Sequence, residues 1–312
     1  MPVRPLTLVT ATAAVALLVV AGCEAKVQAK ANSAPTYADP SLVSSQPPPQ
    51  LAELLFESMT ASQAAPSKGL VALQGRVQQA TDLAAAGGAT LSVAIFDRST
   101  HQLITNGNSQ VVGTASVAKL FIADDLLLHE AEGRTTLSAD DHQALDVMLQ
   151  SSDDGAAEKF WDHDGGDAIV AAVASRYRLP STTPPSDGRW WNTMSSMTDL
   201  IRYYDMLLDG SGGLPPERAK LILNDLARST PTGIDGYPQR FGIPDGLYAE
   251  PVAVKQGWMC CIGTSWMHLS TGVIGADHRY IMVIQSLQPS DDATARDTIT
   301  TAVKTMFPSG RI

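Results

Sequence analysis

Ser116 and Lys119 are the two side chains of this sequence that are best spaced for nucleophilic chemistry. Residues i and i+3 share one face of a helix, so a helix that begins near Ser116 places Lys119 one turn above it. A lysine can take the proton of a neighbouring serine when burial and nearby cations lower its pKa. The N-terminus of the helix adds a partial positive charge that favours a developing oxyanion. The spacing therefore indicates an activated serine, but by itself it is a weak signal.

Two further motifs could complete such a site. Ser152-Asp153-Asp154 supplies a hydroxyl and two carboxylates, although alone it is typical of a helix N-cap followed by acids in the first turn. Lys255-Gln256-Gly257-Trp258 lies in an apolar segment, where a lone lysine is usually a solvated residue of an edge strand. The order of the three motifs along the chain carries more information than any one of them.

Other kinds of site find no support in the sequence. The six histidines are scattered without metal-ligand spacing, and the chain has no Gly-rich phosphate loop. The GxSxG pattern of an α/β-hydrolase is also absent. We therefore expect no metal ion and no cofactor.

The composition is that of an acidic globular protein. The formal net charge is −10, and hydrophobic residues make up 44% of the chain. This charge argues against a nucleic-acid partner, because phosphate binding requires a basic surface. The apolar fraction is sufficient for a sizeable core, which we expect to belong to a monomer.

The N-terminus has the features of an export signal. Arg4 precedes the apolar run Leu6 to Val20, which is too short to span a bilayer, and Ala21-Gly22-Cys23 follows. The last residues resemble a bacterial lipobox, so residues 1–22 are predicted to be a lipoprotein signal peptide and Cys23 the lipidated residue. An ordinary secretory signal is the alternative. Two or more acyl chains, such as palmitate, would anchor the protein stably to the extracytoplasmic face of the cell membrane.

The rest of the chain divides into a tether and a folded domain. Residues 23–66 are rich in Ala, Ser, Pro and Gln and include Pro47-Pro48-Pro49, which is typical of a flexible linker. Residues 67–312 are predicted to form one domain of two lobes.

Hydrophobic periodicity predicts an α+β fold for this domain. A helix over 70–84 precedes strands near 91–95 and 103–104, and the last strands and helix follow a helical lobe of about 116–225. The order implies one antiparallel sheet, flanked by terminal helices and assembled from both ends of the chain. Helices are predicted over 117–129, 139–149, 154–161, 168–178, 197–208 and 291–306, and late strands over 252–258, 266–274 and 280–287.

In this order and on these elements, the three motifs resemble those of the serine β-lactamase and penicillin-binding-protein superfamily. The similarity covers most of the chain from residue 68 onward. It implies that Ser116 is the acylated nucleophile, that Lys119 is its base, and that Ser152 relays a proton to the leaving group. Lys255 would orient the substrate electrostatically. Because two lysines in one cleft disfavour each other's charge, we expect a neutral Lys119 and a charged Lys255.

The resemblance also implies an oxyanion hole and a substrate site. The backbone N–H groups of Ser116 and Trp258 would form the oxyanion hole. Asp154, Gln256 and Gly257 would line the substrate site, which would receive a peptidoglycan peptide, a β-lactam or another acyl compound.

The sequence departs from the superfamily pattern at three places. Asp154 replaces an asparagine that donates to the substrate, and a carboxylate only accepts. Gln256 replaces a Thr or Ser whose hydroxyl binds the substrate carboxylate. No glutamate occurs between Lys159 and Pro216, where class A β-lactamases carry the residue that activates the deacylating water. Asp187 is the nearest acid of note. We therefore predict that the protein is not an efficient β-lactamase.

The paired cysteines Cys260 and Cys261 follow the Lys255 motif, close to the expected rim of the site. Adjacent Cα atoms lie ~3.8 Å apart, below the usual disulfide range, whereas an extracytoplasmic location favours oxidation. A vicinal disulfide, two thiols and an intermolecular bridge all remain open.

Two classes of function are compatible with these features. The first is a cell-envelope serine hydrolase that acts through an acyl-enzyme at Ser116. The second is a lipoprotein without catalytic activity that retains the fold and binds a ligand or a protein. Asp154 and Gln256 favour the second class, and the four residues Ser116, Lys119, Ser152 and Lys255 favour the first.

Overall fold

The structure is a computed structural model and describes residues 68–312. The predicted signal peptide, Cys23 and the predicted tether lie outside these residues. Within the described range, no helix is long and apolar enough to cross a membrane.

A five-stranded antiparallel sheet is built from both ends of the chain, as predicted. The strand order is β2-β1-β7-β6-β5, so β1 from the N-terminal side pairs with β7 from the C-terminal side. This order leaves β5 at one edge of the sheet. The strands are β1 (Thr90–Asp97), β2 (Gln102–Thr105), β5 (Val252–Ile262), β6 (Ser265–Ile274) and β7 (Tyr280–Gln288).

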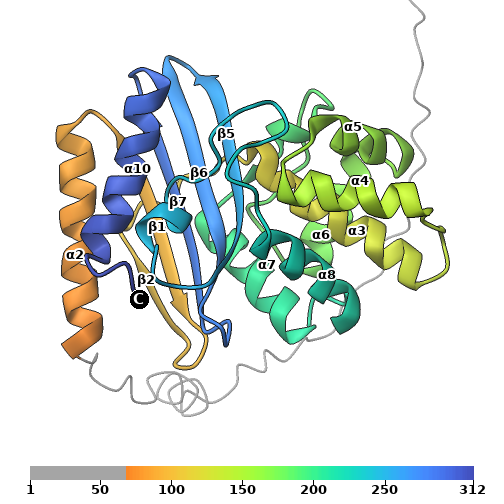
Figure 1. Ribbon diagram of the computed structural model, residues 1–312, viewed down its shortest axis with the longest axis horizontal. Coiled ribbons are helices and arrows are strands. Elements are labelled where there is room, and N and C mark those ends of the chain that lie inside the picture. Colours follow the sequence, from red (N-terminus) through yellow and green to blue (C-terminus); the bar gives the residue numbers. More distant parts are fainter. Residues whose placement is uncertain (1–67) are drawn as a thin grey trace, which may run out of the picture. The chain divides into compact units, whose positions relative to one another are not determined.

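Two terminal helices, α2 (Lys68–Ala86) and α10 (Asp292–Met306), lie side by side and cover one face of the sheet (Figure 1). Apolar residues at helical spacing, such as Val77, Ala80 and Ala84, are buried against the sheet. The helix α2 ends before Gly87-Gly88, and Gly88 has a φ of 79° that suits glycine. The side chain of Asp291 caps α10 by accepting from the backbone N–H of Thr294.

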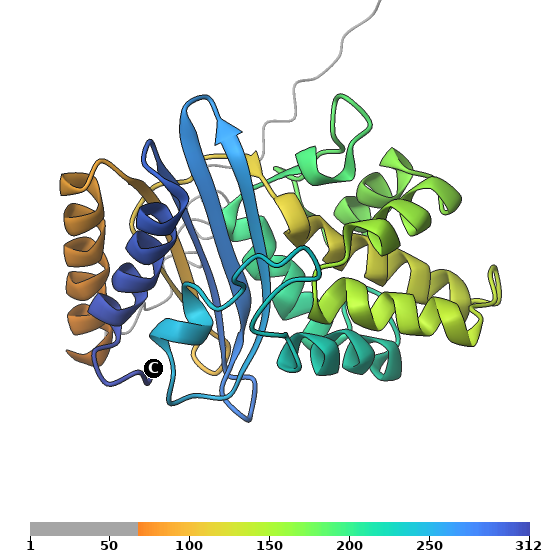
Figure 2. The same cartoon turned by 45° about the horizontal axis from the view of Figure 1, so that its top comes forward.

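Most helices between β2 and β5 lie on the opposite face of the sheet (Figure 2), whereas the short α9 packs against α10 on the same face as the terminal helices. The sheet therefore separates two helical layers. The elements between β2 and β5 are the short β3 (Val112–Gly113), the 3-10 turn η1 (Ala115–Ala118), α3 (Lys119–Ala131), α4 (Ala139–Gln150), α5 (Asp154–His163), α6 (Asp167–Arg176), the 3-10 turn η2 (Trp190–Asn192), β4 (Met194–Ser195), α7 (Met197–Asp209), α8 (Pro216–Ala227) and α9 (Ile243–Gly246).

Helix α3 lies at the centre of the helical layer and is held there by a buried polar cluster. The side chains from Lys119 to Leu128 are all buried. The carboxylate of Asp124 accepts from Nη2 of Arg176 at 2.5 Å and from the hydroxyl of Tyr177. Because burial without partners would be costly for this carboxylate, the cluster fixes α3 relative to α6. The position of α3 matters because its first residue belongs to the candidate site.

Candidate active site

Ser116 and Lys119 face each other across a single tight turn. Ser116 lies in η1, and Lys119 begins α3. Side chains at i and i+3 are eclipsed in a 3-10 turn, and Nζ of Lys119 donates to Oγ of Ser116 at 2.9 Å. Ser116 is 7% exposed and Lys119 is fully buried. The predicted helix over 117–129 therefore begins two residues later than expected, because the turn that carries the serine is a 3-10 turn.

Ser152 joins the two lysines of the site. Its Oγ accepts from Nζ of Lys255 at 2.9 Å and from Nζ of Lys119 at 3.2 Å. Its backbone carbonyl also accepts from Lys119, at 2.8 Å. Ser152 has a φ of 58°, a conformation that costs a residue with a side chain roughly 1–3 kcal/mol. The strained backbone turns both oxygens of one residue toward Lys119.

Lys255 completes the group from the edge strand β5. Its side chain is 1% exposed, and Nζ donates to Ser152 and to the carbonyl of Gln256 at 3.3 Å. It is therefore not the solvated lysine that an edge strand usually carries. The structure thus brings together Ser116, Lys119, Ser152 and Lys255, as the three sequence motifs predict, although their roles stay predictions.

Gly257 allows β5 to approach the turn that carries Ser116. A Cβ atom at Gly257 would lie 2.5 Å from the carbonyl oxygen of Thr114 and 3.4 Å from Cβ of Ala115. A side chain at this position would push the strand and the turn apart. The close approach supports an oxyanion hole made by the N–H groups of Ser116 and Trp258, which stays a prediction.

Gln256 points away from the site, in contrast to its predicted contact with the substrate. Its Nε2 donates to the backbone carbonyls of Gln239 at 3.1 Å and Phe241 at 2.6 Å, and its side chain is buried. Successive side chains of a strand face opposite sides, so Lys255 at the site directs Gln256 to the other face. The structure therefore does not place Gln256 where a substrate carboxylate would bind.

The electrostatics differ from the expectation of a neutral Lys119 and a charged Lys255. Burial lowers the pKa of Lys119, but Asp154 opposes this effect with a carboxylate oxygen 2.5 Å from Nζ. Burial and the neighbouring positive charge of Lys119 lower the pKa of Lys255 well below its usual range. None of the described carboxylates forms a salt bridge with Lys255. Lys119 is therefore the better site for a proton in the resting protein.

A cleft of about 230 Å³ opens above Ser116. Trp190 and Trp191 pack in the helical lobe and also line this cleft. Trp190 is buried with Nζ of Lys119 4.7 Å from its ring centroid, and Trp191 is half-buried at the wall. The residues that line the cleft are Ala115, Ser116, Asp154, Trp190, Trp191, Asp235, Trp258 and Met259.

Cys260 and Cys261 follow Met259 near the end of β5, before the turn to β6. Their sulfurs are joined in a vicinal disulfide, and both residues are exposed. The disulfide thus lies near the rim of the cleft, as expected for this pair of residues.

Asp187, the acid of note in the stretch that lacks a glutamate, does not line the cleft. Asp187 accepts from Nδ2 of Asn192 at 2.8 Å and is not among the residues that line the cleft. The described lining of the cleft contains no glutamate and no histidine. No group of three or more metal-binding side chains occurs in residues 68–312 either.

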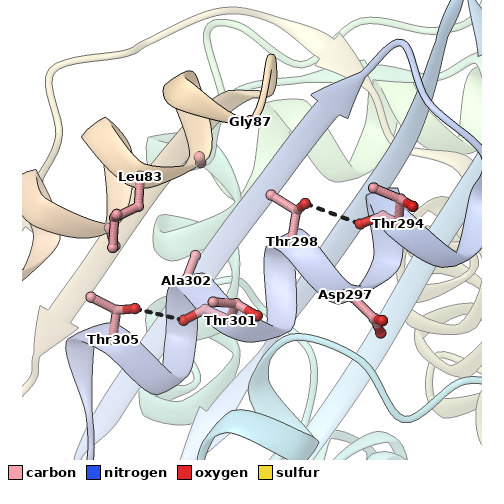
Figure 3. A pocket seen from close by; sticks show the side chains of 10 residues that line it. Leu83, Gly87, Thr294, Asp297, Thr298, Thr301, Ala302 and Thr305 are labelled. Carbon is pink, nitrogen blue, oxygen red and sulfur yellow. Dashed lines mark hydrogen bonds between the residues drawn. The ribbon is translucent and has the colours of Figure 1, made fainter.

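A second cavity, of about 280 Å³, lies between α2 and α10 and contains few groups that could do chemistry. Two of its four threonine hydroxyls donate within their own helix, Thr298 to the carbonyl of Thr294 and Thr305 to that of Thr301 (Figure 3). A hydroxyl has one proton, so a hydroxyl used in this way cannot also donate to a ligand. The cleft at Ser116 is therefore the candidate functional site.

Solved structures with this fold include β-lactamases and a penicillin-binding protein. The protein named PBP-A is 20% identical, with a TM-score of 0.62 over 78% of this chain and 98% of that chain. A structure of its L158E mutant is an acyl-enzyme complex with penicillin G, with a TM-score of 0.63. A β-lactamase from Chitinophaga pinensis is 13% identical, with a TM-score of 0.62 over 76% of this chain and all of that chain. These likenesses establish the fold.

Sequence relatives establish the family. The lipobox-like N-terminus, the predicted tether and the paired cysteines suggest the mycobacterial lipoprotein LppW. No family model matches the sequence. The LppW proteins of Mycobacterium tuberculosis and Mycobacterium bovis are 71% identical to this chain over the full length of both. The chain therefore belongs to the LppW family of lipoproteins, and its described part has the fold of β-lactamases and penicillin-binding proteins.

Proposed function

We propose that this protein is a cell-envelope serine hydrolase that forms an acyl-enzyme at Ser116. One observation carries the proposal: an unbroken chain of hydrogen bonds runs from Oγ of Ser116 through Lys119 and Ser152 to Nζ of Lys255. Its steps are 2.9, 3.2 and 2.9 Å. A nucleophile within hydrogen-bonding distance of a base, with the base held by a third group, is the arrangement that activates a serine.

In this proposal the two lysines share one proton. Lys119 has four acceptors around Nζ, which include Asp154, whereas Lys255 forms no salt bridge with a carboxylate in residues 68–312. A charged Lys119 has no lone pair with which to accept the serine proton. The proton must therefore first pass from Lys119 through Oγ of Ser152 to Lys255. This transfer leaves Lys119 neutral beside Ser116 and Lys255 charged beneath the cleft.

The acylation step then follows from the positions of these groups. Oγ of Ser116 attacks the acyl carbonyl while its proton passes to Lys119, and the oxyanion is stabilised by backbone N–H groups. The bond to the leaving group breaks as the leaving group receives a proton through Ser152. Attack by water on the resulting ester releases the acid and regenerates Ser116.

The same site supports slow turnover of β-lactams. Asp154 offers only a charged acceptor where the superfamily has a donor. Gln256 is turned away from the cleft, and no glutamate lines the cleft in the described residues to activate the deacylating water. We expect an acyl-enzyme formed with penicillin to persist. Peptidoglycan peptides and other acyl compounds are the alternative substrates.

The proposed place of action is the extracytoplasmic face of the cell membrane. The lipobox-like residues before Cys23 support it, because an acylated cysteine and a tether would hold the domain near the cell wall. The lipoprotein name of the relatives agrees with this anchor.

A binding lipoprotein without catalytic activity is the second candidate, and one contact favours it. Oδ1 of Asp154 lies 2.5 Å from Nζ of Lys119, and a carboxylate at that distance favours the protonated lysine. A permanently charged Lys119 would leave Ser116 an ordinary hydroxyl. The domain would then bind its ligand in the same cleft without acylation.

Intact-mass analysis after incubation with a fluorophosphonate probe tests the two candidates. If the protein is a serine hydrolase, we expect one covalent adduct in the wild type, none in Ser116→Ala, and strongly reduced labelling in Lys119→Ala. Ser99→Ala, which alters an exposed serine outside the cleft, should label like the wild type. Absence of an adduct in folded wild-type protein would favour the binding lipoprotein.

A further inference from the structure

The cleft above Ser116 is lined by negative charge alone. Its lining includes the carboxylates of Asp154 and Asp235 but no lysine, arginine or histidine. The two lysines beneath it are buried, and only one of the two carboxylates is paired with them: Asp154 with Lys119. An anionic substrate would meet uncompensated repulsion here, whereas a cationic group would be attracted.

Asp235 is the carboxylate of the cleft that forms no salt bridge in the described residues, although its charge also raises the pKa of the two buried lysines. Its Oδ1 accepts from the backbone N–H of Tyr237 at 2.9 Å, and the residue is exposed. Among the described residues it forms no salt bridge. Its charge is therefore available to a ligand that enters the cleft.

Trp258 is the aromatic ring of the cleft that could bind a cation together with Asp235. Of the three tryptophans in the lining, Trp190 already has Lys119 4.7 Å from its centroid, and Trp191 has Arg189 at 5.8 Å. In the described part of the chain no lysine or arginine lies over Trp258. Its ring is stacked on Tyr237, with centroids 4.5 Å apart and planes at 8°. A tryptophan held rigidly in this way is the best aromatic partner for a cation.

The Asp235 carboxylate, which has no salt bridge in the described residues, and the Trp258 ring, over which no described lysine or arginine lies, are neighbours. Oδ1 of Asp235 and Cη2 of Trp258 lie 2.7 and 3.6 Å from the point that a Cβ atom on Gly233 would occupy. A carboxylate beside an indole ring is the combination that binds alkylammonium groups, because both attract a weakly hydrated cation. Both residues belong to the same cleft as Ser116.

We propose that the acyl substrate carries a cationic group, an amine or quaternary ammonium, that binds between Asp235 and Trp258 while the acyl carbonyl lies at Ser116. This inference rests on the proposed function for the reacting end of the substrate. It differs from the recognition of a substrate carboxylate, for which the cleft provides no cationic side chain. Asp235 and the Trp258 side chain are then specificity residues rather than catalytic ones.

Three fluorophosphonate probes that differ only at the end remote from phosphorus test this inference. One end is trimethylammonium, one is the neutral tert-butyl isostere, and one is a carboxylate. The second-order rate of labelling of the mature protein should be about tenfold higher for the ammonium probe than for its neutral isostere, and lowest for the carboxylate. The advantage of the ammonium probe should shrink as salt is added, because the Asp235 carboxylate is exposed to solvent.

Asp235→Asn should remove most of the preference for ammonium while labelling by the neutral probe persists. Trp258→Leu should reduce the same preference. Asp277→Asn is a matched control: Asp277 is also an exposed aspartate whose Oδ1 accepts from the N–H two residues later, at Arg279, and lies near a glycine. Since Asp277 is not among the residues of the cleft, this variant should keep the full preference.

Binding to Ser116→Ala separates this inference from the proposed function. A trimethylammonium acyl amide should bind this variant, as measured by calorimetry, and binding should weaken about tenfold when Asp235→Asn is added. Labelling that fails with every probe, together with this binding, would overturn the enzyme and retain the cation site. Equal labelling by the ammonium and neutral probes, or amide binding that does not depend on Asp235, would overturn the cation site.

Discussion

Replacing Asp154 by asparagine should increase the reactivity of Ser116. Asp154 is the residue at which this chain departs from the superfamily motif, and its carboxylate lies 2.5 Å from Nζ of Lys119. Burial lowers the pKa of Lys119, and Asp154 opposes this effect. Removal of the carboxylate should therefore lower the pKa of Lys119 further. A larger fraction of Lys119 is then neutral and able to take the serine proton at neutral pH.

The magnitude follows from the exposure of Asp154. Its side chain is 73% exposed although Lys119 is fully buried, so water screens much of the attraction. Two unit charges in close contact in a water-like medium interact by roughly 1 kcal/mol, which is about a fivefold change in the neutral fraction of the lysine. A less basic lysine is also a weaker base, which offsets part of the gain. We expect labelling about two- to fivefold faster near pH 7.

The assay is the rate of fluorophosphonate labelling of Asp154→Asn and wild type from pH 5 to 10, followed by intact mass. The rise of the rate with pH should occur at lower pH in the variant, and the two curves should converge at high pH. Asp153→Asn is the graded control, because asparagine caps a helix as well as aspartate does and Asp153 does not contact Lys119. Its effect should be smaller. A slower Asp154→Asn with an unshifted pH curve would refute the assignment of Lys119 as base.

Three further predictions concern turnover, anchoring and pH. Nitrocefin hydrolysis should be far below the hundreds per second within reach of ordinary enzymes, and a penicillin adduct on Ser116 should persist in intact-mass spectra. Metabolic labelling with palmitate should mark the wild type and not Cys23→Ala. Burial lowers the pKa of His268 to about 4, so the unfolded chain binds an extra proton between that pH and about 6.5, and stability falls as pH decreases through this window. Urea denaturation should show a loss of up to about 3 kcal/mol that is reduced in His268→Gln.

The sheet could be predicted from the sequence because apolar and polar residues alternate along its strands or the strands are apolar throughout. The prediction of one antiparallel sheet assembled from both ends of the chain is confirmed. Helix α8 was not predicted. Its first residue, Pro216, follows Pro215, and a pair of prolines suggests a loop. A proline is nevertheless well suited to the first turn of a helix, where its missing N–H needs no partner.

The four polar residues of the site could be predicted because their types and order are informative. The orientation of Gln256 could not be predicted from strand alternation alone, because Trp258 shares its face of the strand and yet lines the cleft. The backbone carbonyls of Gln239 and Phe241, which accept from its side chain, hold Gln256 away from the cleft. Asp235 had no such signal: Gly233 and Gly236 around it indicate only a turn. Its position depends on a tertiary contact, since the backbone N–H of Ile234 donates to the carbonyl of Ser151 at 2.8 Å.

The polar interior of the site is itself an argument for catalysis. Lys119 and Lys255 are both buried, but only Lys119 is in contact with a described carboxylate, that of Asp154. Ser152, which is hydrogen-bonded to both lysines, has a strained backbone. Burial of a charge and a positive φ each cost stability, and Lys255 lies beneath the cleft rather than in its lining. A protein that only binds a ligand in the cleft would gain nothing from Lys255, whereas an enzyme would need it to receive a proton.

Lys255→Met separates these two cases. Methionine has a similar length and leaves Ser152 hydrogen-bonded to Lys119, so the variant should unfold with a free energy equal to that of the wild type or about 1 kcal/mol higher. Labelling of Ser116 near neutral pH should nevertheless be lost, because Lys119 then has no base to which it can pass its proton through Ser152. Lys304→Met, at an exposed lysine of α10, should change neither stability by more than about 0.5 kcal/mol nor labelling. A stable Lys255→Met protein that labels as fast as the wild type would show that the proton does not travel through Ser152.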